Sequence, residues 1–168
     1  KNKAKGDAAA VAAIAKASNL TINGQELTVN QYVNEDLRKI DSDGKTGTTL
    51  IVNTIEKADL IAANLVDATT INLGKDATAK AADAETIVKT NKTTLNLLAK
   101  TLQISDYKKE DLSAIVSDKD SKLEITTTTD AELFKSNLED ATKITLGDDA
   151  TTTGNDIKAI DGTNRGLQ

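Results

Sequence analysis

A short pattern, apolar–x–apolar, recurs along the whole chain and constrains the fold more than any other feature. Its copies are Leu27-Thr28-Val29, Leu50-Ile51-Val52, Ile71-Asn72-Leu73, Leu102-Gln103-Ile104, Leu123-Glu124-Ile125 and Ile144-Thr145-Leu146. A further copy, Leu95-Asn96-Leu97, divides the one long interval between them. A spacing of about 22 residues is typical of solenoids, in which each coil adds one strand to a shared stack.

A second, longer repeat lies over the first. Residues 58–87 align without gaps with residues 131–160 at an offset of 73, and half of the aligned positions are identical. Residues 20–40 align with residues 95–115 at an offset of 75, which places Tyr32 and Tyr107 at the same position. The two-residue difference falls in the turn before the third strand, where repeat proteins tolerate insertions.

These two repeats predict the fold and the domain organisation. We expect an α/β solenoid with short parallel strands on one side and Ala-rich helices on the other, built from two duplicated units of about 74 residues. The expected division is a helix of a preceding unit over 1–19, unit 1 over 20–94, unit 2 over 95–166, and the start of a third unit at 167–168. Small tandem β-sandwich domains are the alternative fold.

The local pattern predicts where helices and turns lie between these strands. Residues 7–18 have high helix propensity, and Asp7 is placed to cap that helix. Asn23-Gly24 is a strong hairpin signal and predicts a hairpin over 20–29. Further helices are expected over 30–40, 54–68, 76–89, 105–115, 130–141 and 156–160.

Composition excludes several kinds of chemistry. The chain has no Cys and no His, which excludes zinc sites with these ligands, haem, iron–sulfur clusters, Cys nucleophiles and catalytic triads with His. The net charge of −5 argues against nucleic-acid binding and against an anionic membrane surface. No apolar run approaches the roughly 20 residues needed to span a bilayer, so membrane insertion is not expected. We expect no enzymatic activity.

One segment resembles the start of a calcium loop. Asp41-Ser42-Asp43-Gly44 alternates oxygen ligands before a glycine turn, so Asp41 and Asp43 are the candidate metal ligands. A complete EF-hand loop would need an acidic residue where Val52 stands, so that version fails. A plain Asx/Gly turn is the alternative, and no other cofactor is expected.

Aromatic and paired acidic residues offer a second set of candidates. Tyr32 and Tyr107 are interpreted as packing residues of the core, with exposed stacking platforms for sugars as the alternative. Glu35-Asp36 and its equivalent Glu110-Asp111 are adjacent residues that point in different directions, so neither pair faces a glycosidase-type site.

Two segments resemble the tandem modules of very large secreted bacterial proteins, the type I-secreted adhesin-like or surface-layer-like proteins. The segments are Asn64-Leu-Val-Asp-Ala-Thr-Thr-Ile-Asn-Leu73 and Leu123-Glu-Ile-Thr-Thr-Thr-Thr-Asp-Ala-Glu-Leu133. The resemblance implies an extracellular location on a bacterial cell surface and a structural or adhesive role, often beside calcium-binding repeats elsewhere in the parent chain. The glycine-rich calcium nonapeptide of that secretion class does not occur in this sequence.

The expected function is therefore that of a structural or adhesive repeat segment of a bacterial surface-layer or fibre-like protein. Such a segment would act by self-association with identical or neighbouring modules, or by spacing. A glycan- or calcium-binding module of a secreted adhesin is the alternative.

Overall fold

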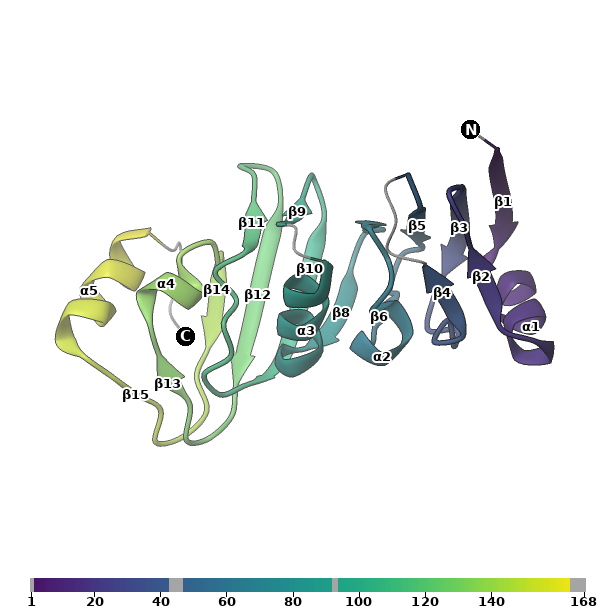
Figure 1. The fold of residues 1–168 in the computed structure, drawn as a ribbon. Coiled ribbons are helices and arrows are strands. Elements are labelled where there is room, and N and C mark those ends of the chain that lie inside the picture. The colour runs from purple at the N-terminus through teal and green to yellow at the C-terminus, as the bar shows by residue number, and fades with distance from the viewer. Residues whose placement is uncertain (1, 43–46, 92–93, 164–168) are drawn as a thin grey trace.

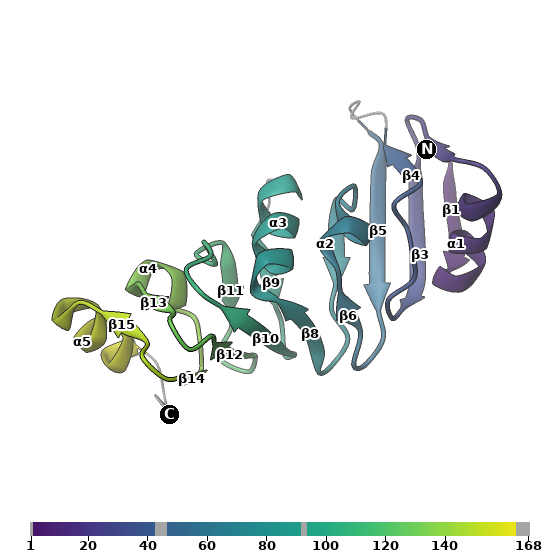
Figure 2. The same cartoon turned by 90° about the horizontal axis from the view of Figure 1, so that it is seen from below.

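The chain forms an elongated mixed α/β structure that advances steadily from one end to the other. The computed structural model describes residues 2–42, 47–91 and 94–163. Figure 1 shows the elements following one another in chain order from the purple N-terminal end to the yellow C-terminal end, and Figure 2 shows the same order after a turn of 90°.

Two larger sheets contain most of the strands. The first sheet has the order β1-β3-β5-β7, and the second has the order β14-β12-β10-β8-β6. The strands of the first are β1 (Lys3–Asp7), β3 (Glu26–Tyr32), β5 (Thr49–Thr54) and β7 (Thr70–Asn72). Those of the second are β6 (Asp59–Leu60), β8 (Ala77–Lys80), β10 (Thr101–Tyr107), β12 (Lys122–Thr127) and β14 (Lys143–Thr145).

The remaining strands form three pairs. These are β2 (Leu20–Ile22) with β4 (Ile40–Ser42), β9 (Leu95–Leu97) with β11 (Ile115–Ser117), and β13 (Glu132–Leu133) with β15 (Thr151–Thr152). Within the described residues, every strand pairing is parallel, and the paired residues lie about 19 to 25 positions apart in sequence. Between two paired strands the chain therefore travels away and returns to the same side.

The described residues contain five helices, four of which lie between strands. They are α1 (Ala8–Ala17), α2 (Ala62–Leu65), α3 (Ala81–Asn91), α4 (Lys135–Leu138) and α5 (Gly154–Thr163). α1 packs against β1 and β3, α2 against α3, and α4 against α5, so the helices do not form one continuous layer. The helix expected over 7–18 is confirmed as α1, although the Asp7 side chain makes no capping hydrogen bond.

The hairpin expected over 20–29 is wrong. β2 pairs with β4, whereas β3 pairs with β1 and β5, so the two expected arms belong to different sheets. Gly24 does have a positive φ of 62°, which is the backbone that an Asn-Gly turn favours. The turn here moves the chain from one sheet to another instead of reversing it within a sheet.

The helices expected over 30–40 and 105–115 are also wrong. β3 and β10 continue to Tyr32 and Tyr107, and irregular segments follow each tyrosine. Leu37 and Ile40 are buried, but they enter the core from the irregular segment and from β4. Pairing of each strand with neighbours on both sides supplies its backbone hydrogen bonds, and this outweighs the local helical spacing of the apolar residues.

The helices expected over 54–68 and 130–141 shrink to single turns. In the first segment, the chain forms β6 and then the four-residue α2, and in the second it forms β13 and the four-residue α4. The apolar positions of the expected stripe divide accordingly: Ala58 and Leu65 are buried, while Ile55 is 41% exposed. Over 76–89 the first residues form β8, and the helix α3 begins only at Ala81.

The core is thin and aliphatic, as the composition predicts. Its largest side chains are Tyr32, Tyr107 and a series of Leu and Ile residues from the strands of every sheet. Among the described residues, no helix is both long and apolar enough to cross a membrane.

Candidate functional site

The proposed calcium turn is only partly described by the structure. Asp41 lies in β4, where its backbone pairs with Thr21, and its side chain is exposed. Asp43 lies outside the described residues. Asp67, which follows α2, lies close enough to Asp41 for the two charges to interact. Burial, and then the charge of Asp41, raise the pKa of Asp67. No group of three or more acidic side chains suited to a metal ion occurs among the described residues.

The corresponding turn in the second half of the chain is closed by its own side chains. The Asp118 carboxylate accepts hydrogen bonds from the Ser121 hydroxyl at 2.6 Å and from the Asp120 amide at 2.9 Å. These bonds lower the pKa of Asp118. Asp118 thus behaves as an Asx turn residue.

A groove of about 470 Å³ lies beside this second turn, between it and the segment that follows α4. Both acidic and basic side chains line it, among them Asp118, Glu139, Asp140 and Lys143. Burial, and then the neighbouring Glu139, raise the pKa of Asp140. Asp140 aligns with Asp67, so a partly buried carboxyl group with a raised pKa occurs once in each half.

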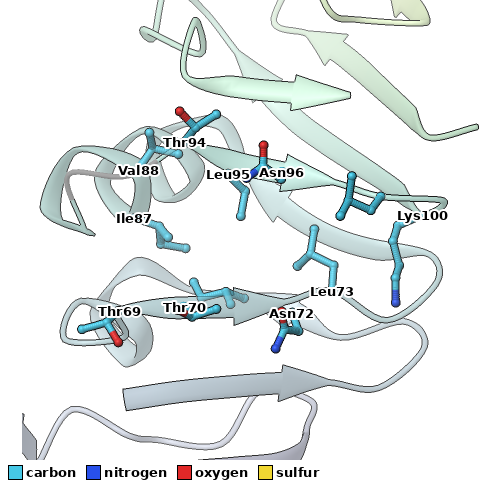
Figure 3. A pocket seen from close by; sticks show the side chains of 12 residues that line it. Thr69, Thr70, Asn72, Leu73, Ile87, Val88, Thr94, Leu95, Asn96 and Lys100 are labelled. Carbon is cyan, nitrogen blue, oxygen red and sulfur yellow. The ribbon is translucent and has the colours of Figure 1, made fainter. Parts of the chain in front are cut away.

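A second groove, of about 400 Å³, opens between β7 and β9 (Figure 3). The two strands run side by side without hydrogen-bonding to each other, and Ile87 of α3 reaches between them beside Leu95. Apart from threonines, the polar residues that line this groove are Asn72, Asn96 and Lys100. The groove therefore combines an aliphatic floor with amide and ammonium groups at its rim.

A row of asparagines crosses the first sheet. The Asn53 amide donates to the Asn30 side-chain oxygen at 2.8 Å, and the Asn72 amide donates to the Asn53 oxygen at 2.7 Å. The helix expected over 30–40 would begin at Asn30, whereas Asn30 lies within β3. An asparagine within or directly after three successive apolar–x–apolar copies was the signal that could have revealed this row.

Both tyrosines are buried, which agrees with the packing interpretation and leaves no exposed platform for a sugar. The Tyr107 hydroxyl accepts a hydrogen bond of 3.4 Å from the Asn137 amide. The Tyr32 hydroxyl has no described partner at hydrogen-bond distance and angle, although Asn64, the counterpart of Asn137, lies near enough to lower the Tyr32 pKa against the larger effect of burial. Burial is the main cause that raises the pKa of Tyr32 to about 12, and burial also raises the pKa of Tyr107.

Unusual backbone conformations recur at aligned positions of the two halves. Gln31 and Asp106 have φ values of 58° and 59°, and Asp76 and Asp149 have values of 57° and 58°. Non-glycine residues adopt such angles only where the surrounding structure requires them. The backbone therefore adopts the same conformation at these positions in both halves, although Gln31 and Asp106 are different residue types.

Hydrogen bonds between side chain and backbone recur in the same way. The Gly74 amide donates to the Thr54 hydroxyl at 2.5 Å, and the Gly147 amide donates to the Thr127 hydroxyl at 2.7 Å. The Thr69 hydroxyl donates to the Leu50 carbonyl, and its aligned partner Thr142 donates to the Leu123 carbonyl. Threonine before or within the strands thus joins successive strands of a sheet.

No family model, curated protein or solved structure matches this chain. Its function has to be argued from its own geometry.

Proposed function

We propose that the chain is an α/β solenoid whose coils each have three sides, so that its segments stack in three columns. The first column consists of β1, β3, β5, β7, β9, β11, α4 and α5. Parallel pairing of β1 to β7 and of β9 with β11 supports it, as does the bond from the Ser117 hydroxyl to the Asp140 carbonyl beside α4.

The other two columns follow from hydrogen bonds that link irregular segments to strands. The second column contains the residues after β3, followed by β6, β8, β10, β12 and β14. The Asp59 amide donates to the Val33 carbonyl at 2.7 Å, which supports its first step. The third column contains β2, β4, α2, α3, the segment after Tyr107, β13 and β15. The Glu132 amide donates to the Lys108 carbonyl at 2.7 Å, which supports the step from that segment to β13.

We further propose that the chain is a duplication of one unit of about 74 residues. In this scheme β8 is the counterpart of β1, α3 of α1, and β10 of β3, because β8 pairs with β10 as β1 pairs with β3. Each later strand of the first half likewise has a counterpart in the second half, and the two strands pair with equivalent neighbours. A unit may equally be counted from β1 or from Leu20, since the repeat is continuous.

The function we propose is structural: a repeat segment of a bacterial extracellular surface-layer or fibre-like protein, acting by self-association or by spacing. The observation that supports this proposal is the set of structural features that the two halves have in common. Positive φ angles, Thr–Gly bonds and buried tyrosines recur, and all of them hold the coil together. Two of the candidate polar features do not recur: Asp41 aligns with Val116, and the asparagine row aligns with Ser105, Thr126 and Thr145. The acidic pair Glu35-Asp36 does recur, as Glu110-Asp111. The bacterial and extracellular parts of this proposal rest on the resemblance of residues 64–73 and 123–133 to secreted modules.

Sedimentation velocity over a concentration series, joined with a glycan array, tests this function. Assembly that grows with concentration, or a rod-shaped monomer that recognises no glycan, agrees with a structural role. A specific glycan bound by the monomer contradicts it and favours a binding module.

The alternative, a glycan- or calcium-binding module, draws on two features. The groove between β7 and β9 presents Asn72, Asn96 and Lys100, which are groups that hydrogen-bond sugar hydroxyls. Asp41 and Asp67 lie close enough for their charges to interact. Thermal unfolding with calcium and with EDTA decides the metal part: an unchanged melting temperature and an unchanged oligomeric state remove it, because a ligand of the native state must stabilise it.

A further inference from the structure

The two long helices that follow β1 and β8 differ in how they meet the segment beside them. Pairing of Ala4 with Leu27 and of Ala77 with Leu102 makes α3 the counterpart of α1, so that Glu85 corresponds to Ala12 and Lys89 to Lys16. The segments beside the two helices contain Asp111 and its counterpart Asp36.

At α3, a carboxylate joins the helix to this segment. One Glu85 oxygen accepts from the Asp111 amide at 3.0 Å and from the Lys89 ammonium at 2.5 Å. Burial opposes the charge of Glu85, but these two donors outweigh it and lower the pKa of Glu85. The carboxylate is therefore held in its charged form between a backbone N–H group and an ammonium group.

At α1 the same place holds no carboxylate. Ala12 replaces the glutamate, and a groove of about 620 Å³ remains between α1 and the 33–39 segment, with Ala9, Ala12 and Ala13 among its lining. The donors persist: Lys16 lines this groove, and no described residue accepts from the Asp36 amide. In the described part of the chain, neither Lys16 nor Lys39 forms an ion pair.

The charged residues around the groove also differ between the halves. At α3, Glu85, Glu110 and Asp111 are balanced by Lys89, Lys108 and Lys109, whereas Ser113 and Ala114 are neutral. At α1 the corresponding cations are Lys16, Arg38 and Lys39, against Glu35 and Asp36.

Both acidic groups at α1 already have partners. Asp36 is held by Arg38 at 2.6 Å, and the Glu35 carboxylate accepts from the Val33 amide at 2.8 Å. The lysines are thus left to attract an anion.

We propose that this groove binds an aliphatic carboxylate. Its carboxylate accepts from the Asp36 N–H and pairs with the ammonium groups of Lys16 and Lys39, in the manner of Glu85 at α3. Its alkyl chain lies on the methyl groups of Ala9, Ala12 and Ala13, which supply the apolar part of the lining. The occupant is a free small molecule, because the groove volume exceeds what one glutamate side chain fills and lies within the range of ligand pockets.

Titration of the isotope-labelled full chain with hexanoate, followed by the amide spectrum, tests this site. Hexanoate is expected to shift the Asp36 amide resonance saturably, because a charged acceptor replaces water at that N–H group. Hexan-1-ol, which has the same chain without the charge, is the matched ligand control and is expected to leave the Asp36 amide unchanged. An equal response to both ligands, or no saturable shift at Asp36, overturns the proposal.

Three variants connect the response to the geometry. Ala12→Glu supplies the carboxylate within the chain, as Glu85 does at α3, and should weaken hexanoate binding by roughly tenfold or more. Glu85→Ala should create a second response at the Asp111 amide. Lys16→Ala should weaken binding about two- to fivefold, since exposed ion pairs contribute little. Undiminished binding by a folded Ala12→Glu variant, judged by its dispersed amide spectrum, contradicts the assignment.

Discussion

The Cα of Gly74 lies against the main chain of Ile55, so that a Cβ atom at residue 74 would come within 2.3 Å of the Ile55 carbonyl carbon and oxygen. Gly147 lies in the same way against Thr128, with a distance of 2.5 Å to the carbonyl oxygen. The conflict in both places is with backbone, which cannot turn aside as a flexible side chain can.

Alanine at either glycine should therefore destabilise the protein. For Gly74→Ala and Gly147→Ala we expect a loss of about 3 kcal/mol in the free energy of unfolding, since two adjacent backbone segments must separate to admit the methyl group. Urea unfolding followed by circular dichroism measures it. Gly154→Ala is the matched control, because nothing lies within 4 Å of a Cβ there, and its stability should be equal or slightly higher. Equal stability of Gly74→Ala and Gly154→Ala would mean that the close approach is absent in solution.

Asn53 is the central member of the asparagine row, with one hydrogen bond on each side. Asn53→Ala removes both bonds and should cost about 1 to 2 kcal/mol in urea unfolding. Thr126→Ala, at the aligned position of the second half, removes an exposed side chain outside any such row and should change stability by less than about 0.5 kcal/mol. A similar effect of the two substitutions would show that the row adds nothing.

The two buried tyrosines should respond in opposite directions to removal of their hydroxyl groups. Tyr32→Phe removes a buried oxygen without a hydrogen-bond partner, so the variant should be as stable as the parent or more stable by up to about 1 kcal/mol. Tyr107→Phe loses the bond from Asn137 and should be less stable by about 0.5 to 1 kcal/mol. Thermal or urea unfolding of both variants decides this. A clear loss of stability in Tyr32→Phe would reveal an unseen partner of the Tyr32 hydroxyl.

The raised pKa of Tyr32 predicts how stability changes in alkaline solution. The protonated phenol is the neutral form, and the folded state keeps its proton up to about pH 12, whereas the unfolded chain releases it near the ordinary pKa of 10.0. Between these values the folded state binds more protons, so stability should fall as the pH rises and should not depend on Tyr32 below pH 10.

Comparison of the parent with Tyr32→Phe isolates this contribution, because both proteins share all other titrating groups. The stability difference between them should change between pH 10 and pH 12. A difference that stays constant over this interval would show that Tyr32 ionises equally in both states.

The strands that contain the apolar–x–apolar pattern were predictable from the sequence, and the reason is physical. Val29, Val52 and Ile104 are each fully or almost fully buried, so an apolar side chain is required at the same point of each successive strand. Short strands such as β6, β8 and β13 were not predictable, and they lie where helices were expected. The helices were predictable where they are ten residues or longer, as in α1 and in α5, which contains the helix expected over 156–160. Ala58 and Leu65 lie at helical spacing, yet one precedes β6 and the other ends a single turn, because the pairing of β6 with β8 decides the backbone there.

Polar features were harder to foresee. The asparagine row depends on register between strands, which the pairing of Asn53 with Asn72 reveals and a single strand does not. The groove beside Ala12 exists because α1 has no side chain equivalent to Glu85 of α3. That comparison requires knowing that α1 and α3 face equivalent segments. The calcium turn stays a prediction, since Asp43 lies outside the described residues.

The proposed three-column stack has a consequence for any array built from such units. Ten segments run from β1 to β7, counting α1, α2 and the irregular segment 33–39, and ten is not a multiple of three. Each unit therefore begins one column further on than the last, as β1, β8 and β15 do, and the array has the symmetry of a threefold screw. A groove or side chain carried once per unit would wind around the rod and return to the same azimuth only at every third unit. Such a rod has no front or back, and neighbours could approach it equally from three directions.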